Sequence, residues 1–475
     1  MDSFFDDFSM TIDGAAATGT ETIAVINPAT EKVVAHAPDC SREQLDVAVA
    51  AARRAFPGWR ATPIDERRAA VAKLGEILKT HAEDFARLFT LEQGRPLGGA
   101  RMEIDYAAWW ASAVAKMDVP VTINEDTEQR RSETRHVPVG VVAGIVPWNF
   151  PVNLAMWKIA PALLTGNTLV LKPSPFTPLT MLKLAELARE HLPPGVFNVV
   201  SGGDRLGPWL TAHPGIDKIS FTGSTATGKR VMETASADLK RITLELGGND
   251  AAIVLPDVDV EAVADKLFFS AFYNTGQICI ATKRMYIHED IYDQLSAALA
   301  TRASAARVGD GLEQGSEFGP IQNRQQFERV KDLIADAKAN NLTFLAGGDI
   351  SDDTGYFVPI TLVDNPPEDS RVVQEEAFGP VLPLLKFATV DEAIERANAS
   401  EYGLGGSVWS SDPEAAVKVA ERLETGTVWI NESFYVMPWT PFAGRKMSGL
   451  GVENGTEGLL EFTTPQTISM VKAAA

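Results

Sequence analysis

Short apolar runs alternate with longer helical patterns through most of the chain, and this alternation is the feature that most limits the possible folds. The first series starts at Val137 and contains apolar runs at 141–146, 168–171 and 196–200, separated by helical patterns at 154–164 and 178–191. A second alternating series begins near Ile242 and continues beyond Val428. Strands that alternate with helices pair in parallel, because each crossover helix packs back onto the sheet. The sequence therefore predicts an α/β fold built from βαβ units.

The N-terminal part predicts helices followed by a hairpin. Ser41 and Gln44 form a capping-box pattern, so we expect a helix to begin there, and a second helical pattern covers 64–91. Between 119 and 136, two extended Val-containing stretches flank a polar centre. This pattern predicts a long exposed hairpin, and a hairpin of this kind needs a partner surface to stay ordered.

Composition excludes several classes of protein. The chain has 475 residues, of which 22% are charged and 45% hydrophobic, and its formal net charge is −20. These values are typical of a globular enzyme of two or three domains, and the negative charge disfavours nucleic acid and anionic lipid as partners. The first thirteen residues contain four Asp and no cation, unlike a signal or transit peptide, and no apolar run approaches the ~18 residues that span a bilayer. We expect a cytoplasmic protein.

Only two cysteines are present, so the chain has no disulfide framework. Cys279 follows Gly276-Gln277-Ile278, whereas Cys40 lies at the start of a predicted helix. A lone thiol in this setting is a candidate nucleophile. Free cysteine is also among the most buried residue types, so the local sequence leaves a packing role for Cys279 equally open.

A candidate phosphate-binding loop spans 223–230. It follows a strand-like run at 218–221 and opens a helix, so its backbone N–H groups and the helix dipole favour an anion. A Walker loop requires Ser or Thr after the lysine, and Arg230 stands there. The G-x-G-x-x-G dinucleotide fingerprint is also absent. The pattern favours a phosphate-adjacent helix cap, with an ordinary strand-to-helix turn as the alternative.

Two further motifs carry polar side chains with a chemical use. Asn149 lies between aromatic and proline residues in Pro147-Trp148-Asn149-Phe150-Pro151, a rigid segment suited to a preorganised donor for an oxyanion. Glu245 lies between two leucines, where desolvation raises a carboxyl pKa toward that of a general base. The turn-rich segments 375–380 and 441–449 combine polar and aromatic residues, and each alone is compatible with a structural role.

Taken together, these motifs resemble the aldehyde dehydrogenase superfamily over nearly the whole chain. The resemblance rests on seven motifs in order: 147–151 (PWNFP), 171–174 (LKPS), 221–224 (FTGS), 244–248 (LELGG), 276–279 (GQIC), 376–380 (EAFGP) and 426–431 (GTVWIN). It implies a Rossmann-like cofactor domain at 1–118 and 139–246 and an α/β catalytic domain at 247–447. It also implies a small β oligomerisation arm at 119–138 and 448–475, which forms a homodimer or homotetramer.

The resemblance implies an NAD(P)-dependent oxidation of an aldehyde to the carboxylic acid. Cys279 would attack the aldehyde, and the Asn149 amide with the Cys279 backbone N–H would hold the oxyanion. Hydride transfer leaves a thioester, which water activated by Glu245 hydrolyses. Branches that pass the acyl group to coenzyme A typically lack this glutamate, so its presence favours hydrolysis. No metal is expected.

The resemblance implies cofactor contacts at the positions of this chain that match the family's motifs. Trp148 and Lys172 are expected near the adenosine ribose, Ser224 at the pyrophosphate, and Glu376 and Phe378 around the nicotinamide ribose; Ser174, Gly223 and Gly247 complete this set. Many NAD-preferring relatives have Glu three residues after the lysine, where it repels a 2′-phosphate. Pro175 stands there in this chain. We therefore expect NAD as the cofactor, with NADP possible.

An apolar or aromatic aldehyde is the expected substrate. Positions that line the aldehyde tunnel in relatives carry Phe150, Asn153, Trp157, Tyr273, Phe434 and Tyr435 in this chain, with Trp109 and Trp110 nearby. Relatives that oxidise acidic semialdehydes often have Arg where Trp157 precedes Lys158. An uncharged aromatic wall favours an apolar ligand, although aromatic residues are also common in cores.

Two other classes remain as alternatives. A cofactor-independent thiol esterase or hydrolase also needs a lone cysteine, but it usually pairs that cysteine with a histidine, and none of the six histidines lies in a comparable glycine-rich motif. A catalytically silent binding protein on the same fold is the second alternative. It would have no reason to retain Cys279, Glu245 and Asn149 together.

Overall fold

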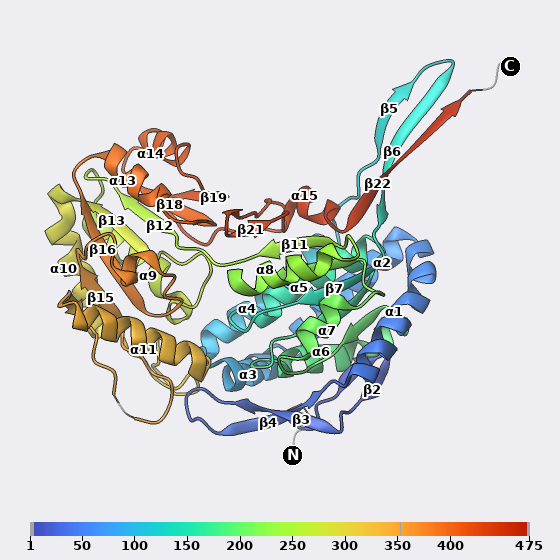
Figure 1. The fold of residues 1–475 in the computed structure, drawn as a ribbon, viewed down its shortest axis with the longest axis horizontal. Helices are drawn as coiled ribbons and strands as arrows, with labels where there is room; N and C mark the ends of the chain where they lie inside the picture. Colours follow the sequence, from blue (N-terminus) through green and yellow to red (C-terminus); the bar gives the residue numbers. More distant parts are fainter. Residues whose placement is uncertain (1–3, 352, 473–475) are drawn as a thin grey trace.

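The first alternating series forms an eight-stranded sheet (Figure 1). The computed structural model describes residues 4–351 and 353–472. The strand order is β2-β1-β9-β8-β7-β10-β11-β21. Its five parallel strands are β7 (Val141–Ile145), β8 (Thr168–Lys172), β9 (Phe197–Val199), β10 (Lys218–Thr222) and β11 (Arg241–Glu245). The edge strands β2 (Ala15–Ala17) and β21 (Gly449–Leu450), and β1 (Met10–Ile12) between β2 and β9, pair antiparallel with their neighbours. Strands β7, β8 and β10 are buried throughout, which explains why they are continuous apolar runs rather than alternating ones.

Helices cover this sheet. The crossover helices are α5 (Pro151–Leu164), α6 (Leu179–Ala188), α7 (Leu206–Ala212) and α8 (Thr225–Ser236). The N-terminal helices are α1 (Arg42–Ala61), α2 (Ile64–Thr80), α3 (Ala82–Gln93) and α4 (Leu97–Val114). The capping box predicted at the start of α1 is present, because Ser41 Oγ accepts from the Gln44 N–H while the Gln44 side chain accepts from the Ser41 N–H.

The single helix predicted over 64–91 is wrong. The chain leaves helical geometry at His81, with φ −110° and ψ 27°, and separates α2 from α3. Both helices bury an apolar stripe against the same core, so the apolar pattern continues across the break. Packing of α2 and α3 against α4, and not local sequence, decides where the direction changes.

The second alternating series forms a seven-stranded sheet in the order β14-β15-β16-β13-β12-β18-β19. Its strands are β12 (Ala251–Val254), β13 (Arg284–His288), β14 (Thr343–Ala346), β15 (Thr361–Asp364), β16 (Val381–Phe387), β18 (Gly405–Trp409) and β19 (Thr427–Ile430), all parallel except β14. Its helices are α9 (Val260–Phe272), α10 (Glu289–Ala305), α11 (Arg324–Ala339), α12 (Arg371–Gln374), α13 (Val390–Asn398) and α14 (Pro413–Ala420). Successive residues of β12 join separate apolar clusters, so both faces of this sheet are covered.

The predicted hairpin is present and projects from the body of the molecule (Figure 1). It consists of β5 (Thr122–Asp126) and β6 (Arg130–Pro138). A third strand, β22 (Thr463–Val471), pairs antiparallel with β6 along its whole length, from Thr463 opposite Pro138 to Val471 opposite Arg130. We call these three strands the arm. Its partner strand therefore comes from the same chain, more than three hundred residues away.

The remaining elements are short. They are the β3 (Glu21–Ile26) and β4 (Val33–Asp39) pair, the β17 (Tyr402–Gly403) and β20 (Arg445–Lys446) pair, α15 (Gly455–Leu460), and the 3₁₀ helices at Arg189–His191 and Tyr273–Gly276. Within 4–351 and 353–472, no helix is both long and apolar enough to span a bilayer. The segment after β11 leads directly from the first sheet to β12 of the second, so residues 246–250 connect the two.

Candidate active site

Asn149, Glu245 and Cys279, predicted from three separate motifs, line one cavity of about 150 Å³. Asn149 lies between β7 and α5, Glu245 is the last residue of β11, and Cys279 precedes β13. Strands β7 and β11 are parallel members of one sheet, so their carboxyl ends lie at the same edge. Ligand sites of parallel sheets form at this edge.

The loop before Cys279 has an unusual backbone. Asn274, Thr275 and Gly276 are consecutive residues with positive φ, at 52°, 58° and 73°. A Cβ on Gly276 would lie 2.3 Å from the Gly379 carbonyl oxygen, so glycine is required there. Left-handed conformation in non-glycine residues costs on the order of 1–3 kcal/mol each, and it persists only where the surroundings impose it.

Burial and nearby charges favour the protonated thiol of Cys279 over its thiolate. Burial raises the pKa of Cys279 well above its ordinary value, and the nearby Glu245 carboxyl raises it further, whereas Lys283 opposes the shift. Lys283 Nζ donates to the Cys279 carbonyl oxygen at 2.5 Å. Cys40, by contrast, is buried under the first sheet with a pKa raised to about 12 by burial. Cys40 is therefore a packing residue.

Glu245 is a desolvated carboxyl. Neither of its oxygens meets a partner with good hydrogen-bond geometry among the described residues, and the Cys279 thiol beside it only opposes the rise in its pKa. Burial raises the pKa of Glu245 to about 8, and Lys158 opposes this shift. The direction of this shift is the one that the flanking leucines predict.

The Asn149 amide is held by one bond and has one N–H to spare. Its Nδ2 donates to the Gln277 carbonyl oxygen at 3.0 Å. A primary amide carries two N–H donors, so this bond orients the group and leaves the second donor for another acceptor. Because Gln277 precedes Cys279 by two residues, the bond also fixes Asn149 relative to the thiol.

A groove of about 830 Å³ adjoins the cavity. Trp148, Gly223, Ser224 and Arg329 line both spaces, so the two are continuous. Predicted cofactor residues Lys172 and Ser174 line the groove, as does Pro175. Ser224 caps α8 by accepting from the Thr227 N–H, and the helix that it starts directs its N-terminal dipole toward the groove.

Glu376 lines the cavity that contains Cys279. Its Oε1 accepts from the Gly248 N–H at 3.1 Å and lies 3.5 Å from Lys283 Nζ. A Cβ on Gly247 would lie 2.4 Å from Glu376 Oε2, so only glycine lets the carboxylate approach. The Phe378 and Trp148 rings meet edge to face at 5.4 Å. The dimensions and donors of groove and cavity fit an extended dinucleotide.

The predicted substrate residues fall into two groups. Tyr273 bridges Phe150 and Phe434, with ring centroids 6.3 and 6.2 Å apart. Trp157 instead stacks on Trp110 at 5.2 Å, beside Trp109. Asn153 and Trp157 are buried one turn apart on α5, and within the described chain neither Asn153 Oδ1 nor Trp157 Nε1 has a partner. Tyr435 is exposed and precedes Val436, whose carbonyl oxygen accepts from the Tyr106 hydroxyl next to the second group.

Several residues at the site were missed by sequence reasoning. Lys283, Arg329 and Asp204 line or approach the two spaces, and Arg95 binds the backbone of Asn149. Lys283 lies four residues after the candidate nucleophile, which is a signal that could have been used. Arg95 has no such signal, because it is remote in sequence from every motif.

Comparison with known protein families agrees with the geometry of the site. The sequence model of the Aldehyde dehydrogenase family matches residues 15–468. The chain belongs to the aldehyde dehydrogenase family. The resemblance and the fold inferred from the seven motifs are thus confirmed.

Relatives of this aldehyde dehydrogenase match over nearly their full length. Phenylacetaldehyde dehydrogenase from Pseudomonas fluorescens is 40% identical over 468 residues, covering 95% of this chain and 93% of the relative. The crystal structure of an E. coli NADP-dependent enzyme is 35% identical with a TM-score of 0.96, covering 99% of both chains. The NAD⁺ complex of an aldehyde dehydrogenase from Bacillus cereus is 37% identical with a TM-score of 0.94, covering 99% of this chain and 98% of that one.

Proposed function

We propose that this aldehyde dehydrogenase oxidises an apolar or aromatic aldehyde to the carboxylic acid with NAD(P), through a covalent intermediate on Cys279. The observation that carries the proposal is the cavity shared by Cys279, Glu245 and Asn149, which opens into the dinucleotide-sized groove. A nucleophile, a raised-pKa carboxyl and a free amide donor in one enclosed space are the groups that acyl chemistry requires.

Each of the three residues has a task that its surroundings support. The Cys279 thiol releases its proton to solvent water, the resulting thiolate attacks the aldehyde carbon, and the free N–H of Asn149 with the Cys279 backbone N–H receives the oxyanion. When bound, the nicotinamide supplies the hydride acceptor that converts the thiohemiacetal to a thioester. Glu245, whose pKa of about 8 suits proton transfer near neutral pH, then takes a proton from the hydrolytic water.

NAD is the proposed cofactor, with NADP also accepted. Trp148, Lys172, Ser174, Gly223 and Ser224 would hold the adenosine and phosphate groups, while Gly247, Glu376 and Phe378 would hold the nicotinamide ribose. Support comes from the groove and from the relatives described above, one in complex with NAD⁺ and one NADP-dependent. Pro175 provides no carboxylate to repel a 2′-phosphate.

The substrate proposal rests on the aromatic residues grouped around Phe150, which directly follows the cavity-lining Asn149, and around Trp157. Phe150, Tyr273 and Phe434 form one uncharged group of rings, and Trp157 with Trp110 forms another. Similarity to a phenylacetaldehyde dehydrogenase supports an aromatic substrate. Such walls favour apolar ligands over a second carboxylate.

The proposal extends to assembly. Exposed apolar side chains on and beside the arm give it an unpartnered surface; they are Val121, Ile123, Ile468, Met470 and Val471. This surface supports a homodimer or homotetramer. The proposal also includes a cytoplasmic location and the domain division at 1–118 and 139–246, 247–447, and 119–138 and 448–475. This division assigns strand β21 (Gly449–Leu450) to the arm segment, although β21 pairs with β11 of the first sheet.

Replacement of the thiol tests the mechanism. Cys279→Ala is expected to abolish aldehyde-dependent formation of reduced cofactor across a panel of aliphatic, aromatic and acidic aldehydes, while cofactor binding is retained. Cys40→Ala, the matched control, should retain wild-type turnover. Residual turnover of Cys279→Ala above roughly 1% of wild type would contradict covalent catalysis. Ester hydrolysis without cofactor, in the absence of aldehyde oxidation, would favour a thiol hydrolase instead.

A further inference from the structure

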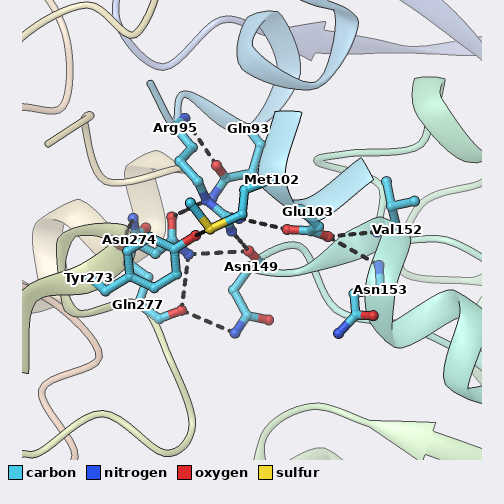
Figure 2. Close-up of polar contacts among 10 residues, drawn as sticks. All are labelled: Gln93, Arg95, Met102, Glu103, Asn149, Val152, Asn153, Tyr273, Asn274 and Gln277. Atoms are coloured by element: carbon cyan, nitrogen blue, oxygen red, sulfur yellow. Dashed lines mark hydrogen bonds and ion pairs between the residues drawn. The ribbon is translucent and has the colours of Figure 1, made fainter. Parts of the chain in front are cut away.

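Arg95 lies at the centre of a buried polar network behind the candidate active site (Figure 2). Its side chain is 2% exposed and ion-pairs with Glu103, which is 1% exposed, at 2.7 Å. The remaining nitrogens donate to the Asn149 carbonyl oxygen at 2.6 Å and to Asn274 Oδ1 at 2.9 Å. The guanidinium also stacks over the Phe150 ring at 4.2 Å. Three directed bonds from one plane require the guanidinium fork, which lysine cannot reproduce.

Asn274 passes this restraint to the loop that carries the thiol. Because its Oδ1 accepts from Arg95, its Nδ2 is turned toward the Asn149 carbonyl oxygen at 3.2 Å and the Gln277 carbonyl oxygen at 3.3 Å. Gln277 O is also the acceptor of the Asn149 side-chain amide. Asn149 is therefore fixed at its backbone by Arg95 and Asn274, and at its side chain by the loop that Asn274 supports (Figure 2).

Glu103 attaches the same network to helix α5. Its Oε1 accepts from the Val152 and Asn153 N–H groups at the first turn of the helix, at 3.0 and 3.1 Å. These residues lie shortly after Asn149. The network thus holds the segment on both sides of the oxyanion donor, while none of Gln93, Arg95 and Glu103 lines the cavity itself.

We propose that Arg95 is a positioning residue for the oxyanion step, acting through Asn274 to aim the Asn149 amide at the carbon attacked by Cys279. This inference rests on the proposed function. A misplacement of a reacting group by about 1 Å can slow an enzyme on the order of 10²-fold, so loss of the fork has a kinetic consequence without any contact to substrate.

A double-mutant cycle between Arg95 and Asn149 tests the proposal. Arg95→Lys keeps a cation beside Glu103 but supplies a single point donor, and Asn149→Ala removes the amide while keeping the backbone carbonyl that Arg95 binds. The rate constant of the reduced-cofactor burst is measured by rapid mixing in wild type, both single variants and the double variant. Arg101→Lys is the matched control, because Arg101 is exposed and pairs with Glu83 and Asp105 instead.

The expected result is non-additivity. Arg95→Lys should slow the burst by about 10-fold or more in the wild-type background and by less than about 2-fold in Asn149→Ala, because the amide to be positioned is then absent. Cofactor affinity should be unchanged in both, and Arg101→Lys should match wild type. An equal effect of Arg95→Lys in the two backgrounds, or no effect in either, would overturn the proposal. A wild-type protein without aldehyde oxidation would refute the proposed function instead.

If Arg95→Lys fails to fold, Asn274→Asp takes its place in the cycle. Aspartate tolerates the positive φ of Asn274 and still accepts from Arg95, but it presents an oxygen to the carbonyls of Asn149 and Gln277. The same loss of effect in the Asn149→Ala background is expected, and an equal effect in both backgrounds again contradicts the inference.

Discussion

At the scale of single residues, the proposed role of Glu245 predicts that the two halves of the reaction can be separated. If Glu245 activates the hydrolytic water, Glu245→Gln should still complete acylation, because Cys279 and Asn149 are untouched. The expected result in rapid mixing is a burst approaching one equivalent of reduced cofactor per site, followed by nearly stalled turnover. An acyl adduct on Cys279 should appear by intact mass. Absence of both burst and adduct in a variant that binds cofactor would assign Glu245 to acylation or folding.

The pKa of Glu245 gives this prediction a pH dependence. Burial raises that pKa to about 8, so the fraction of base, and with it the deacylation rate, should rise up to a plateau above pH 8. Glu245→Gln should lose this dependence when the decay of the adduct is followed from about pH 6 to about pH 9.5. The folded state also binds more protons than the unfolded chain between the ordinary carboxyl pKa and 8. The contribution of Glu245 to the free energy of unfolding therefore falls as pH rises through that range.

Pro175 is the residue on which cofactor preference should depend. NADP should support turnover within about two orders of magnitude of NAD in kcat/KM, equivalent to roughly 3 kcal/mol. Pro175→Glu should shift the preference further toward NAD by about 10-fold or more, since the new carboxylate repels a 2′-phosphate in the groove. Pro175→Gln is the neutral control. Complete rejection of NADP by the wild type would contradict this view.

Residues with a distinctive local pattern were predictable from the sequence, and residues that act at a distance were not. Glu245 between two leucines and Cys279 after a glycine-containing turn could be singled out from the sequence alone. Arg95 could not, because its bond to Asn149 joins residues 54 apart and its bond to Asn274 joins residues 179 apart. Nothing in one sequence states which of 43 Lys and Arg residues folds beneath the site.

At the scale of elements, the close approach of helices α2 and α4 requires a residue without a side chain at their contact. A Cβ on Gly75 in α2 would lie 2.5 Å from the Ala108 carbonyl oxygen of α4. Gly75→Ala should therefore force α2 away from α4 and lower the free energy of unfolding by about 1–3 kcal/mol, measured by thermal or denaturant unfolding. Gly58→Ala in α1, where nothing lies within 4 Å of the new Cβ, should be neutral or stabilising. Equal effects of the two substitutions would show that this contact is not limiting.

The elements themselves were largely predictable because their apolar runs are local. The capping box at Ser41 marked the start of α1, and strands β7, β8, β9 and β10 of the first sheet followed from apolar runs. The second sheet was predicted only as an alternating series, without individual strands. The break at His81 was not predictable, since the apolar stripe continues through it. The strand order, with β9, β8 and β7 beside β10, was equally hidden, because it depends on crossover packing and not on local pattern.

At the scale of the whole molecule, the arm should control assembly. A chain ending at Thr464 loses most of β22 and leaves β6 with an open edge. We expect a smaller assembly by light scattering and a lower Tm than for a control chain ending at Lys472, which keeps the strand. An unchanged mass would place the subunit contact elsewhere.

Because β6 pairs with the C-terminal strand β22, the edge of β6 stays unpaired for part of the time in which the chain is synthesised. Pro138 and its partner Thr463 are separated by 463 − 138 = 325 residues. At a ribosomal rate of about 5–20 residues per second, the hairpin emerges roughly 16–65 s before the strand that completes it. Throughout that interval the edge of β6 is available to any other extended chain, including the same hairpin on a neighbouring nascent copy. Two copies translated side by side on one message would therefore compete with the chain's own C-terminal strand, so slower synthesis of residues 139–462 should increase misassembly.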